Sequence, residues 1–344
     1  MGWYTHVYIF IRELKKSKPI LGQILSISLN LTLVIQVFFI LLSVYIYGEH
    51  IAGHFIRNSI QSTFYMMIYL SLVSMTALCL LVTVLTPVAR VPQTYRVSDV
   101  NDKQLKSLTA QIDGKFVREK SSKENIQKQV ALLDMLANER KLIMVEGSRC
   151  GGYKYCYDCQ HLKPDRSKHC RSCGHCVLRY DHHCPYINKC INHHNYKSFC
   201  LYIFYSCLSV VWFFLSSSEC VLRFIIYSDW ENDMNSMIWI ISALIPVSII
   251  GFSVYADLLF YHYYLIQNNS TTAEEASSFH MRLDVSISYD IGKEENFSQT
   301  FGWGLWFFPL WTSLEDGLHY EIKNSPLAKY QVKRVVCDKE NTIH

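Results

Sequence analysis

The chain has 344 residues, of which 50% are hydrophobic and 18% are charged, and its formal net charge is +4. This length allows about two domains. The apolar residues gather in long uncharged blocks, which argues against an ordinary soluble protein, and so small a positive charge needs no nucleic-acid partner to explain it.

Four blocks contain no Asp, Glu, Lys or Arg, and each reaches the roughly 20 residues that a helix needs to cross a membrane. They are residues 19–48, 58–89, 198–218 and 234–256. Four buried helices of a soluble core are the alternative, but such helices keep a polar stripe and these blocks have almost none. The first block is too long for a signal-peptide core and lacks a convincing cleavage site, so we interpret it as retained. We predict transmembrane helices at 21–47, 64–86, 198–218 and 237–260.

The distribution of Lys and Arg predicts the orientation of these helices. One basic residue lies in each loop that joins spans one and two or spans three and four, whereas 20 lie from Arg90 to Lys197 and seven follow the fourth span. Positive residues accumulate on the cytoplasmic side. We therefore expect both termini and the long middle segment to be cytoplasmic. The predicted cytoplasmic parts are residues 1–18, a linker at 87–155, a cysteine-rich module at 156–197 and a C-terminal region at 261–344, with a lumenal loop at 219–236.

Within the linker, residues 126–144 carry apolar side chains at near-helical spacing with charges between them. This pattern predicts an amphipathic helix. Such a helix packs either on the cysteine-rich module or on the membrane surface, and we favour the first.

The cysteine-rich module holds seven cysteines in the 35 residues from Cys156 to Cys190, spaced as C-x2-C, H-C-x2-C-x2-C and D-H-H-C. In a reducing cytoplasm such a cluster indicates metal binding or catalysis rather than disulfides. Eight soft ligands are enough for two four-coordinate zinc ions. The eight are Cys156, Cys159, His169, Cys170, Cys173, Cys176, Cys190 and one histidine of the pair His182 and His183.

The preferred partition of these ligands gives each zinc three thiolates and one imidazole. One site takes Cys156, Cys159, His169 and Cys176, and the other takes Cys170, Cys173, His183 and Cys190, although the spacing alone does not fix this pairing. Both sites would be closed and structural. A module of this size with so small a core needs bound metal ions to stabilise its fold, and we expect short β-hairpins around the two metals.

Cys184 is left over once the ligands are assigned, and it lies beside an acid and two histidines. His182 could accept the thiol proton, with Asp181 fixing the tautomer of His182 and stabilising the imidazolium. Because sequence neighbours rarely form such a triad in a regular helix or strand, we expect an irregular loop pinned by a metal-bound His183. This arrangement predicts a cysteine nucleophile, held near the bilayer because the module hangs between spans two and three.

Residues 156–199 resemble the cysteine-rich domain of the DHHC protein S-acyltransferases, or palmitoyltransferases. The matching positions outside the cysteines include Lys163-Pro164-x-Arg166, Asn195 and Phe199. Beyond the fourth span, Thr271-Thr272-Ala273-Glu274 resembles the TTxE motif of the family, and Tyr289-Asp290-x-Gly292-x3-Asn296 resembles its C-terminal motif. An integral membrane, mainly α-helical protein with the module between its second and third spans also fits this family.

The resemblance implies a two-step, ping-pong transfer of a fatty acyl group from palmitoyl-CoA or another long-chain acyl-CoA. Cys184 would be the acylated nucleophile, and the acceptors would be cytoplasmic cysteines of membrane-associated proteins. Thr272 would position Asp181, Asn296 would brace the C-terminal segment, and the acyl chain would lie among the spans. We expect a multi-pass protein of the eukaryotic endomembrane system or plasma membrane, with the Golgi or endoplasmic reticulum favoured, and two structural zinc ions.

The chain departs from the family pattern at three positions near the last ligand. Tyr186, the expected acyl-chain contact, stands where the family usually has Trp, Lys189 replaces the usual Asn, and Asn192 replaces the usual Gly. These departures bear on acyl preference and loop geometry. His193 and His194 are expected at the surface.

Other classes of function explain the sequence less well. An inactive zinc-stabilised membrane scaffold is the main alternative, and the intact Asp181-His182-His183-Cys184 string argues against it. A ubiquitin ligase with a RING-type module does not match the ligand spacing. A zinc transporter would carry ionisable residues inside its spans.

Overall fold

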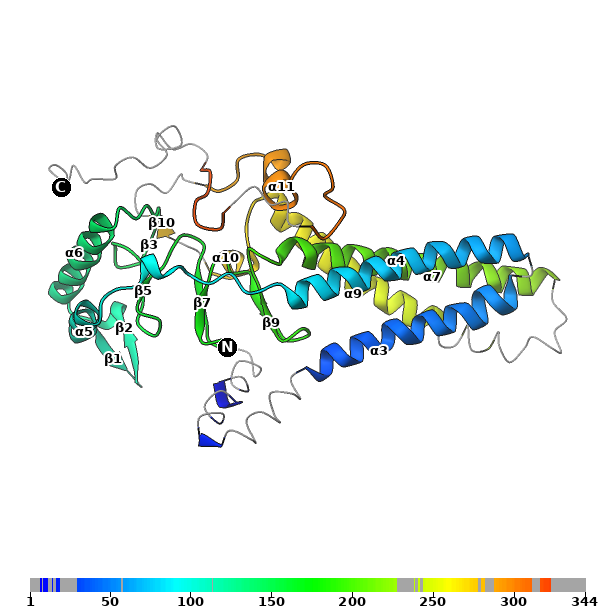
Figure 1. Ribbon diagram of the computed structural model, residues 1–344, viewed down its shortest axis with the longest axis horizontal. Coiled ribbons are helices and arrows are strands. Elements are labelled where there is room, and N and C mark those ends of the chain that lie inside the picture. The colour runs from blue at the N-terminus through cyan, green and yellow to red at the C-terminus, as the bar shows by residue number, and fades with distance from the viewer. Residues whose placement is uncertain are drawn as a thin grey trace.

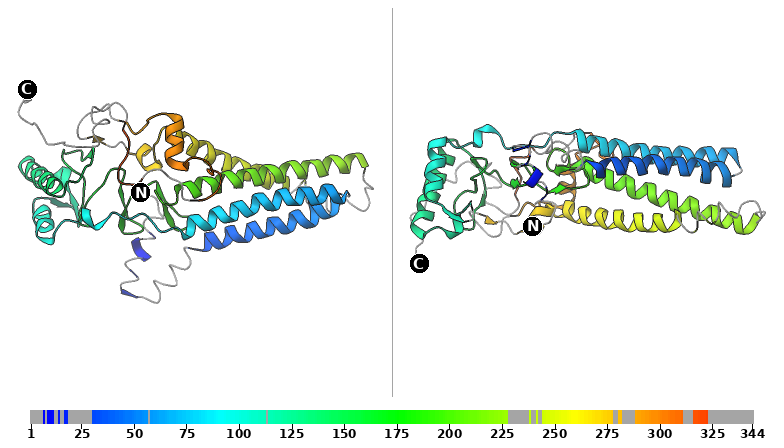
Figure 2. Two further views of the ribbon diagram at one scale, coloured as in Figure 1. Left: turned by 45° about the horizontal axis from the view of Figure 1, so that its top comes forward. Right: turned by 90° about the horizontal axis from the view of Figure 1, so that it is seen from below.

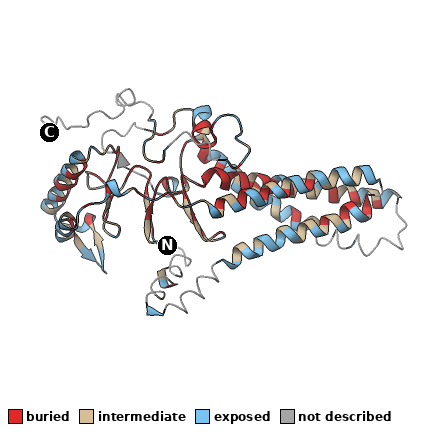
Figure 3. Cartoon of the chain, viewed as in Figure 1, coloured by how far each residue is buried: buried red, intermediate tan, exposed pale blue. Residues whose placement is uncertain are grey.

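The computed structural model describes residues 30–56, 58–112, 114–227, 244–277, 288–310 and 316–322, together with residues 7, 9–11, 14, 17–18, 238, 241 and 280–281. Four of its helices are long and apolar enough to cross a membrane, and they run side by side at one end of an elongated molecule (Figures 1 and 2). They are α3 (Leu31–Ile46, continued by a π-helix over Tyr47–Phe55), α4 (Ser59–Leu85), α7 (Tyr196–Tyr227) and α9 (Ile245–Gln267). The outer faces of the bundle are exposed (Figure 3), and many of the exposed side chains there are large and apolar, as contact with lipid requires.

Local sequence explains where these helices begin and end. Asn58 caps α4 by accepting hydrogen bonds from the backbone N–H groups of Ile60 and Gln61. The same helix stops at Leu85 because Pro87 disfavours helical backbone in the residue before it. α7 begins two residues before the predicted span 198–218 and extends nine residues beyond it. α9 extends past the predicted end of span four at residue 260, and most of the predicted start of that span lies outside the described residues.

Short antiparallel hairpins make up the part of the chain between α4 and α7. Three hairpins lie in the cysteine-rich module: β4 (Tyr155–Cys156) with β5 (His161–Leu162), β6 (Lys168–Cys170) with β7 (His175–Val177), and β8 (His182–Cys184) with β9 (Lys189–Ile191). A fourth hairpin pairs β1 (Ala110–Ile112) with β2 (Lys115–Val117), and β3 (Glu146–Gly147) pairs with β10 (His280–Met281), a strand that follows α9. The predicted architecture, four apolar helices with hairpins between the second and third, is confirmed.

Two helices cover the outer end of the hairpins, α5 (Asp99–Ser107) and α6 (Lys123–Glu139). The helix predicted over 126–144 is therefore confirmed, although it ends at Glu139, just before Lys141 takes a positive φ of 53°. Its buried side chains, which include Leu133 and Leu136, share one apolar cluster with Cys156 and Cys176. The helix packs on the cysteine-rich module, as favoured.

After α9 the chain returns to the hairpins through α10 (Thr272–Glu275) and α11 (Lys293–Phe301). α11 lies beside the ends of α7 and α9 that adjoin the cysteine-rich module (Figure 1). The C-terminal region thereby ties the helix bundle to the module.

Candidate active site and metal sites

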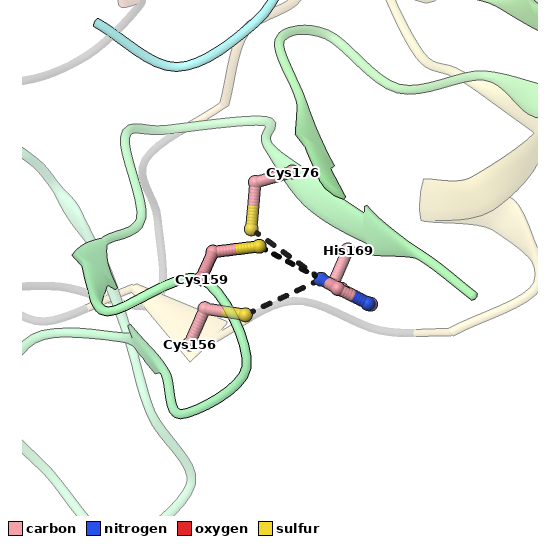
Figure 4. Close-up of side chains that lie close together, drawn as sticks. All are labelled: Cys156, Cys159, His169 and Cys176. Carbon is pink, nitrogen blue, oxygen red and sulfur yellow. Dashed lines mark hydrogen bonds between the residues drawn. The ribbon is translucent and has the colours of Figure 1, made fainter. Parts of the chain in front are cut away.

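The first predicted quartet of ligands comes together in the structure. Figure 4 shows the three cysteine sulfurs gathered around the ring of His169, whose Nδ1 lies 3.4, 3.2 and 3.9 Å from the Sγ atoms of Cys156, Cys159 and Cys176. A tetrahedral zinc with bonds of about 2.0–2.3 Å holds its ligand atoms roughly 3.5–3.8 Å apart. The donor set and its spacing therefore fit a zinc ion.

The second quartet has the same form. Nδ1 of His183 lies 3.6, 3.4 and 3.6 Å from the Sγ atoms of Cys170, Cys173 and Cys190. In each quartet the candidate ligand atoms all lie within 4.8 Å of one another. The structure thus groups the eight residues in the partition that the sequence favoured.

Strand alternation explains why neighbouring residues serve different quartets. His169 and Cys170 are adjacent on β6, so their side chains point to opposite faces, His169 toward the first quartet and Cys170 toward the second. Cys176 lies directly opposite His169 on β7 and joins the same quartet. One hairpin therefore contributes to both sites.

The same alternation builds the candidate catalytic group on β8. His182 and Cys184 are two residues apart and share a face, while His183 points the other way into the second quartet. The expectation of an irregular loop is wrong here. β8 is a regular strand paired with β9, and a two-residue period is enough to bring base and thiol to one side.

A buried carboxylate holds the imidazole of His182. Oδ2 of Asp181 lies 2.6 Å from Nδ1 of His182. Burial lowers the pKa of His182, but hydrogen bonds with Asp181 and Cys184 outweigh it and raise the pKa to about 10. Burial likewise raises the pKa of Asp181, and the hydrogen bond with His182 reverses that effect, so the carboxyl pKa lies below its ordinary value. Asp181 is therefore ionised at neutral pH.

The TTxE segment, which follows α9 in the chain, contacts the carboxylate of Asp181 through Thr272. Thr272 donates its backbone N–H to Oδ1 of Asp181 (2.8 Å) and its hydroxyl to Oδ2 (3.0 Å). Thr271 caps α10 in a reciprocal capping box with Glu274. Glu274 also forms a buried, two-bonded ion pair with Arg166, at 2.9 and 3.0 Å. This pair fixes α10 against the cysteine-rich module.

Asn296 lies on α11, away from the thiol. Its Nδ2 donates to the carbonyl of Gln267 at the end of α9 and to Oδ1 of Asp290, both at 2.7 Å. Its Oδ1 accepts from the backbone N–H of Ile291 at 3.1 Å. The side chain links α9 to the loop before α11.

The three departures from the family pattern have different structural settings. The side chain of Tyr186 is 65% exposed. Lys189 donates to the carbonyl of Val84 at the end of α4. Asn192 is fully buried: it accepts from the backbone N–H of Ala89 (3.0 Å) and donates to the carbonyl of Cys190 (2.9 Å). The side chain of Asn192, where the family usually has glycine, thus links the chain after α4 to β9, the strand that carries Cys190.

One of the two histidines expected at the surface is buried. His193 is only 4% exposed and its backbone N–H donates to Leu178, whereas His194 is half-buried with Nδ1 3.1 Å from the carbonyl of Pro87. The two histidines lie in the turn between β9 and α7, where tertiary contacts that a sequence pattern does not reveal decide which side chain is covered.

His262 on α9 was missed by the sequence analysis. It is buried, its Nδ1 lies 3.1 Å from the hydroxyl of Tyr196, and its ring centre lies 5.2 Å from that of Phe199 and 6.4 Å from that of His182. The signal in the sequence was a histidine in a mostly apolar segment, just beyond the predicted end of span four.

A basic cleft of about 1250 Å³ opens along the cysteine-rich module. Eight Lys or Arg and four Asp or Glu line it, among them Lys154, Lys163 and Lys168 beside His169. The net positive charge of this lining suits a polyanionic group.

Comparison with known proteins agrees with this geometry. The DHHC palmitoyltransferase family model matches residues 150–278. The chain is 38% identical over 323 residues to palmitoyltransferase spe-10 of Caenorhabditis elegans, covering 94% of this chain and 92% of that protein. It is 31% identical over 223 residues to palmitoyltransferase ZDHHC20-B of Danio rerio (60% and 65% covered) and 29% identical over 179 residues to palmitoyltransferase ZDHHC20 of Homo sapiens (48% and 46%). The chain belongs to the DHHC palmitoyltransferase family of protein S-palmitoyltransferases.

Proposed function

We propose that the protein moves a long-chain acyl group from acyl-CoA to a cysteine of membrane-associated proteins through an acyl-Cys184 thioester. The observation that carries this proposal is the shared face of His182 and Cys184, with His182 held by the ionised Asp181. A thiol next to a base that a third group orients is the arrangement of an activated nucleophile.

The first half-reaction forms the thioester on the enzyme. His182, whose pKa is raised, holds the proton from Cys184 as an imidazolium, and the thiolate attacks the thioester carbonyl of acyl-CoA. The new sulfur–carbonyl bond forms as the bond to CoA breaks, and the departing CoA thiolate takes the proton from His182. Asp181, positioned by Thr272, stabilises the imidazolium between these two proton transfers.

The second half-reaction repeats these steps with a different thiol. The acceptor cysteine gives its proton to His182, its thiolate attacks the acyl-Cys184 carbonyl, and Cys184 leaves and is reprotonated. The basic cleft would receive the CoA phosphates, because Lys154, Lys163 and Lys168 line it. The acyl chain would lie among the spans, with Tyr186 as a contact at its start, since each buried methylene contributes about 0.8 kcal/mol.

The two cysteine and histidine quartets would each hold a structural zinc ion. Zinc bound there supplies folding free energy to a module with little core of its own. We also propose that both termini face the cytoplasm and that the protein resides in the Golgi or endoplasmic reticulum, where the acceptors would be membrane-associated proteins with cytoplasmic cysteines.

Autoacylation of the purified protein with labelled palmitoyl-CoA tests this function, with Cys184→Ser as the comparison. Hydroxylamine-sensitive label on the wild type alone, with release of one CoA per labelled enzyme before any acceptor is added, is the expected result. A folded, zinc-loaded wild type that takes no label from palmitoyl-CoA would support the inactive scaffold instead.

A further inference from the structure

The end of α3 next to the cysteine-rich module carries two polar side chains one helical turn apart, Thr32 and Gln36. Both face the backbone that directly follows Cys184. The hydroxyl of Thr32 lies 3.2 Å from the carbonyl oxygen of Pro185 and 2.9 Å from that of Tyr186. Nε2 of Gln36 donates to the same Tyr186 carbonyl at 2.9 Å.

Gln36 also connects this backbone to α7. Its Oε1 accepts from the hydroxyl of Tyr202 at 2.9 Å, and that hydroxyl lies 3.5 Å from the hydroxyl of Tyr255 on α9. A single carboxamide therefore joins α3, the segment after Cys184 and α7. We call these contacts of Thr32 and Gln36 the α3 clasp.

The clasp adds to the other described contacts of α3 at this end, which are the packing of Leu33 on an apolar cluster and a hydrogen bond from Asn188 to Asn30. No residue of α3 is buried, and its outer side chains, such as Val34, Phe38 and Leu41, are exposed (Figure 3). Against lipid, apolar contacts between helices contribute little, because lipid tails are as apolar as the side chains, so polar ties gain in importance.

The thiol lies in the same apolar cluster as the inner face of α3. Cys184 and Tyr202 belong to this cluster, and Leu33 and Ile40 of α3 pack against it. An acyl chain attached to Cys184 would therefore begin its path between α3 and α7, at the level of the clasp.

We propose that Thr32 and Gln36 are positioning residues for the acylation of Cys184. The clasp fixes the segment Cys184-Pro185-Tyr186 against α3 and so sets the direction in which the acyl chain leaves the thiol. This rests on the proposed function. Loosening the clasp would slow formation of the acyl-enzyme and weaken discrimination between chain lengths.

A double-mutant cycle tests the clasp: Gln36→Met, Tyr202→Phe and both together, each assayed for acyl-enzyme formation with lauroyl-, palmitoyl- and arachidoyl-CoA. Each single change should slow the palmitoyl reaction about tenfold, as expected for loss of a hydrogen bond that positions the reacting segment. The double variant should be little slower than Gln36→Met alone, because that change already removes the bond between Gln36 and Tyr202. The difference in rate between the three chain lengths should narrow. Thr32→Val, the milder change, should also slow acylation and narrow the rate differences between chain lengths, but by less.

Gln61→Met and Tyr65→Phe form the matched control. They make the same two substitutions at the other end of the bundle, where Gln61 and Tyr65 both bond Glu219 of α7 at 3.1 and 2.5 Å. This pair should leave the acylation rate within about twofold of the wild type and the chain-length profile unchanged. An equal loss of acylation rate in the clasp variants and in the control pair would overturn the proposed positioning role. Additive effects of Gln36→Met and Tyr202→Phe on that rate would overturn it as well.

Alkylation of Cys184 by a maleimide, located by mass spectrometry, separates this inference from the proposed function. Cys184 is only 5% exposed, so loosening the clasp should raise its alkylation rate severalfold while the control pair leaves it unchanged. Faster alkylation in Gln36→Met together with an unlabelled wild type would support the clasp and refute the acyltransfer. Unchanged alkylation and acylation in Gln36→Met would refute the clasp alone.

Discussion

At the scale of single residues, the site depends on the alternation of side chains along one short strand. His182 and Cys184 face one way and His183 faces the other, so the same three residues of β8 serve both the candidate catalytic group and a metal quartet. Inserting or deleting one residue here would exchange the two faces. The spacing of the D-H-H-C string is therefore fixed by geometry as well as by chemistry.

Thr272 should matter for the rate of acyl-enzyme formation. Thr272→Val keeps the shape of the side chain and the backbone N–H bond to Asp181, but it removes the hydroxyl that donates to Oδ2. A hydrogen bond to a charged group contributes about 1.5–3 kcal/mol, so we expect acyl-enzyme formation to slow roughly 10- to 100-fold. Thr272→Ser, which keeps the hydroxyl, should retain most of the activity. Equal rates for Val and Ser variants in a single-turnover assay would contradict a role for this hydroxyl.

The Asp181–His182 pair should also give stability a pH dependence on the alkaline side. The pKa of His182 is raised from 6.5 to about 10, so its contribution is fully present below pH 6.5 and is lost as the pH rises through about 10. The pKa of Asp181 is lowered, so the contribution of the carboxylate is present above its ordinary value of 3.8 and stays constant in that window. We expect the melting temperature of the wild type to fall between pH 6.5 and 10 more steeply than that of Asp181→Asn. Parallel curves in differential scanning fluorimetry would show that the pair does not titrate in this way.

The sequence predicts the site residues that lie close together along the chain. It does not predict those that are distant in sequence and come into contact only in the folded protein. The ligand quartets and the Asp181-His182-Cys184 group lie within 35 residues, where cysteine spacing and strand period constrain them. The contacts of Gln36 with Tyr202 and Tyr186 span at least 150 residues. They depend on the rotation of α3, which the largely apolar sequence of that helix does little to indicate.

At the scale of elements, each hairpin of the module depends on its metal site. The β6–β7 hairpin has two strands of three residues, and such a hairpin is at best marginally stable alone. Structural zinc supplies about 10–16 kcal/mol of apparent binding free energy, as much as the whole stability of a typical domain. The hairpins are therefore expected to fold with their metals.

Cys173→Ser should accordingly lower the zinc content and unfold the module. Cys173 belongs to the second quartet, and the hairpin that carries it also contributes His169 and Cys176 to the first. We expect fewer than two zinc ions per chain by elemental analysis, faster proteolysis between α4 and α7, and no autoacylation. Cys150→Ser is the control, because Cys150 belongs to neither quartet. Two zinc ions and full activity in Cys173→Ser would refute the two-site arrangement.

At the scale of the whole molecule, the four helices and the module define one functional end. The start of α3 lies beside the turn between β8 and β9 through a hydrogen bond of Asn188 with Asn30, and the end of α4 is bonded to Lys189. α7 begins directly after the module, and α9 ends at α10, which reaches Asp181. Every chain segment that enters or leaves the described bundle at this end therefore passes the candidate active site.

The side of the membrane on which this end lies is predicted by charge. Of the 33 Lys and Arg residues, only Arg57 and Arg223 fall in the loops predicted between spans one and two and between spans three and four. Positive residues are retained in the cytoplasm, so this end and both termini should face it. Protease added to sealed microsomes whose cytoplasmic face is outward should remove a C-terminal tag. A glycosylation acceptor inserted between residues 228 and 237 should become glycosylated. A protected tag together with an unmodified acceptor would indicate the opposite topology. Cys184 would then lie on the lumenal side of the membrane, away from cytoplasmic acyl-CoA.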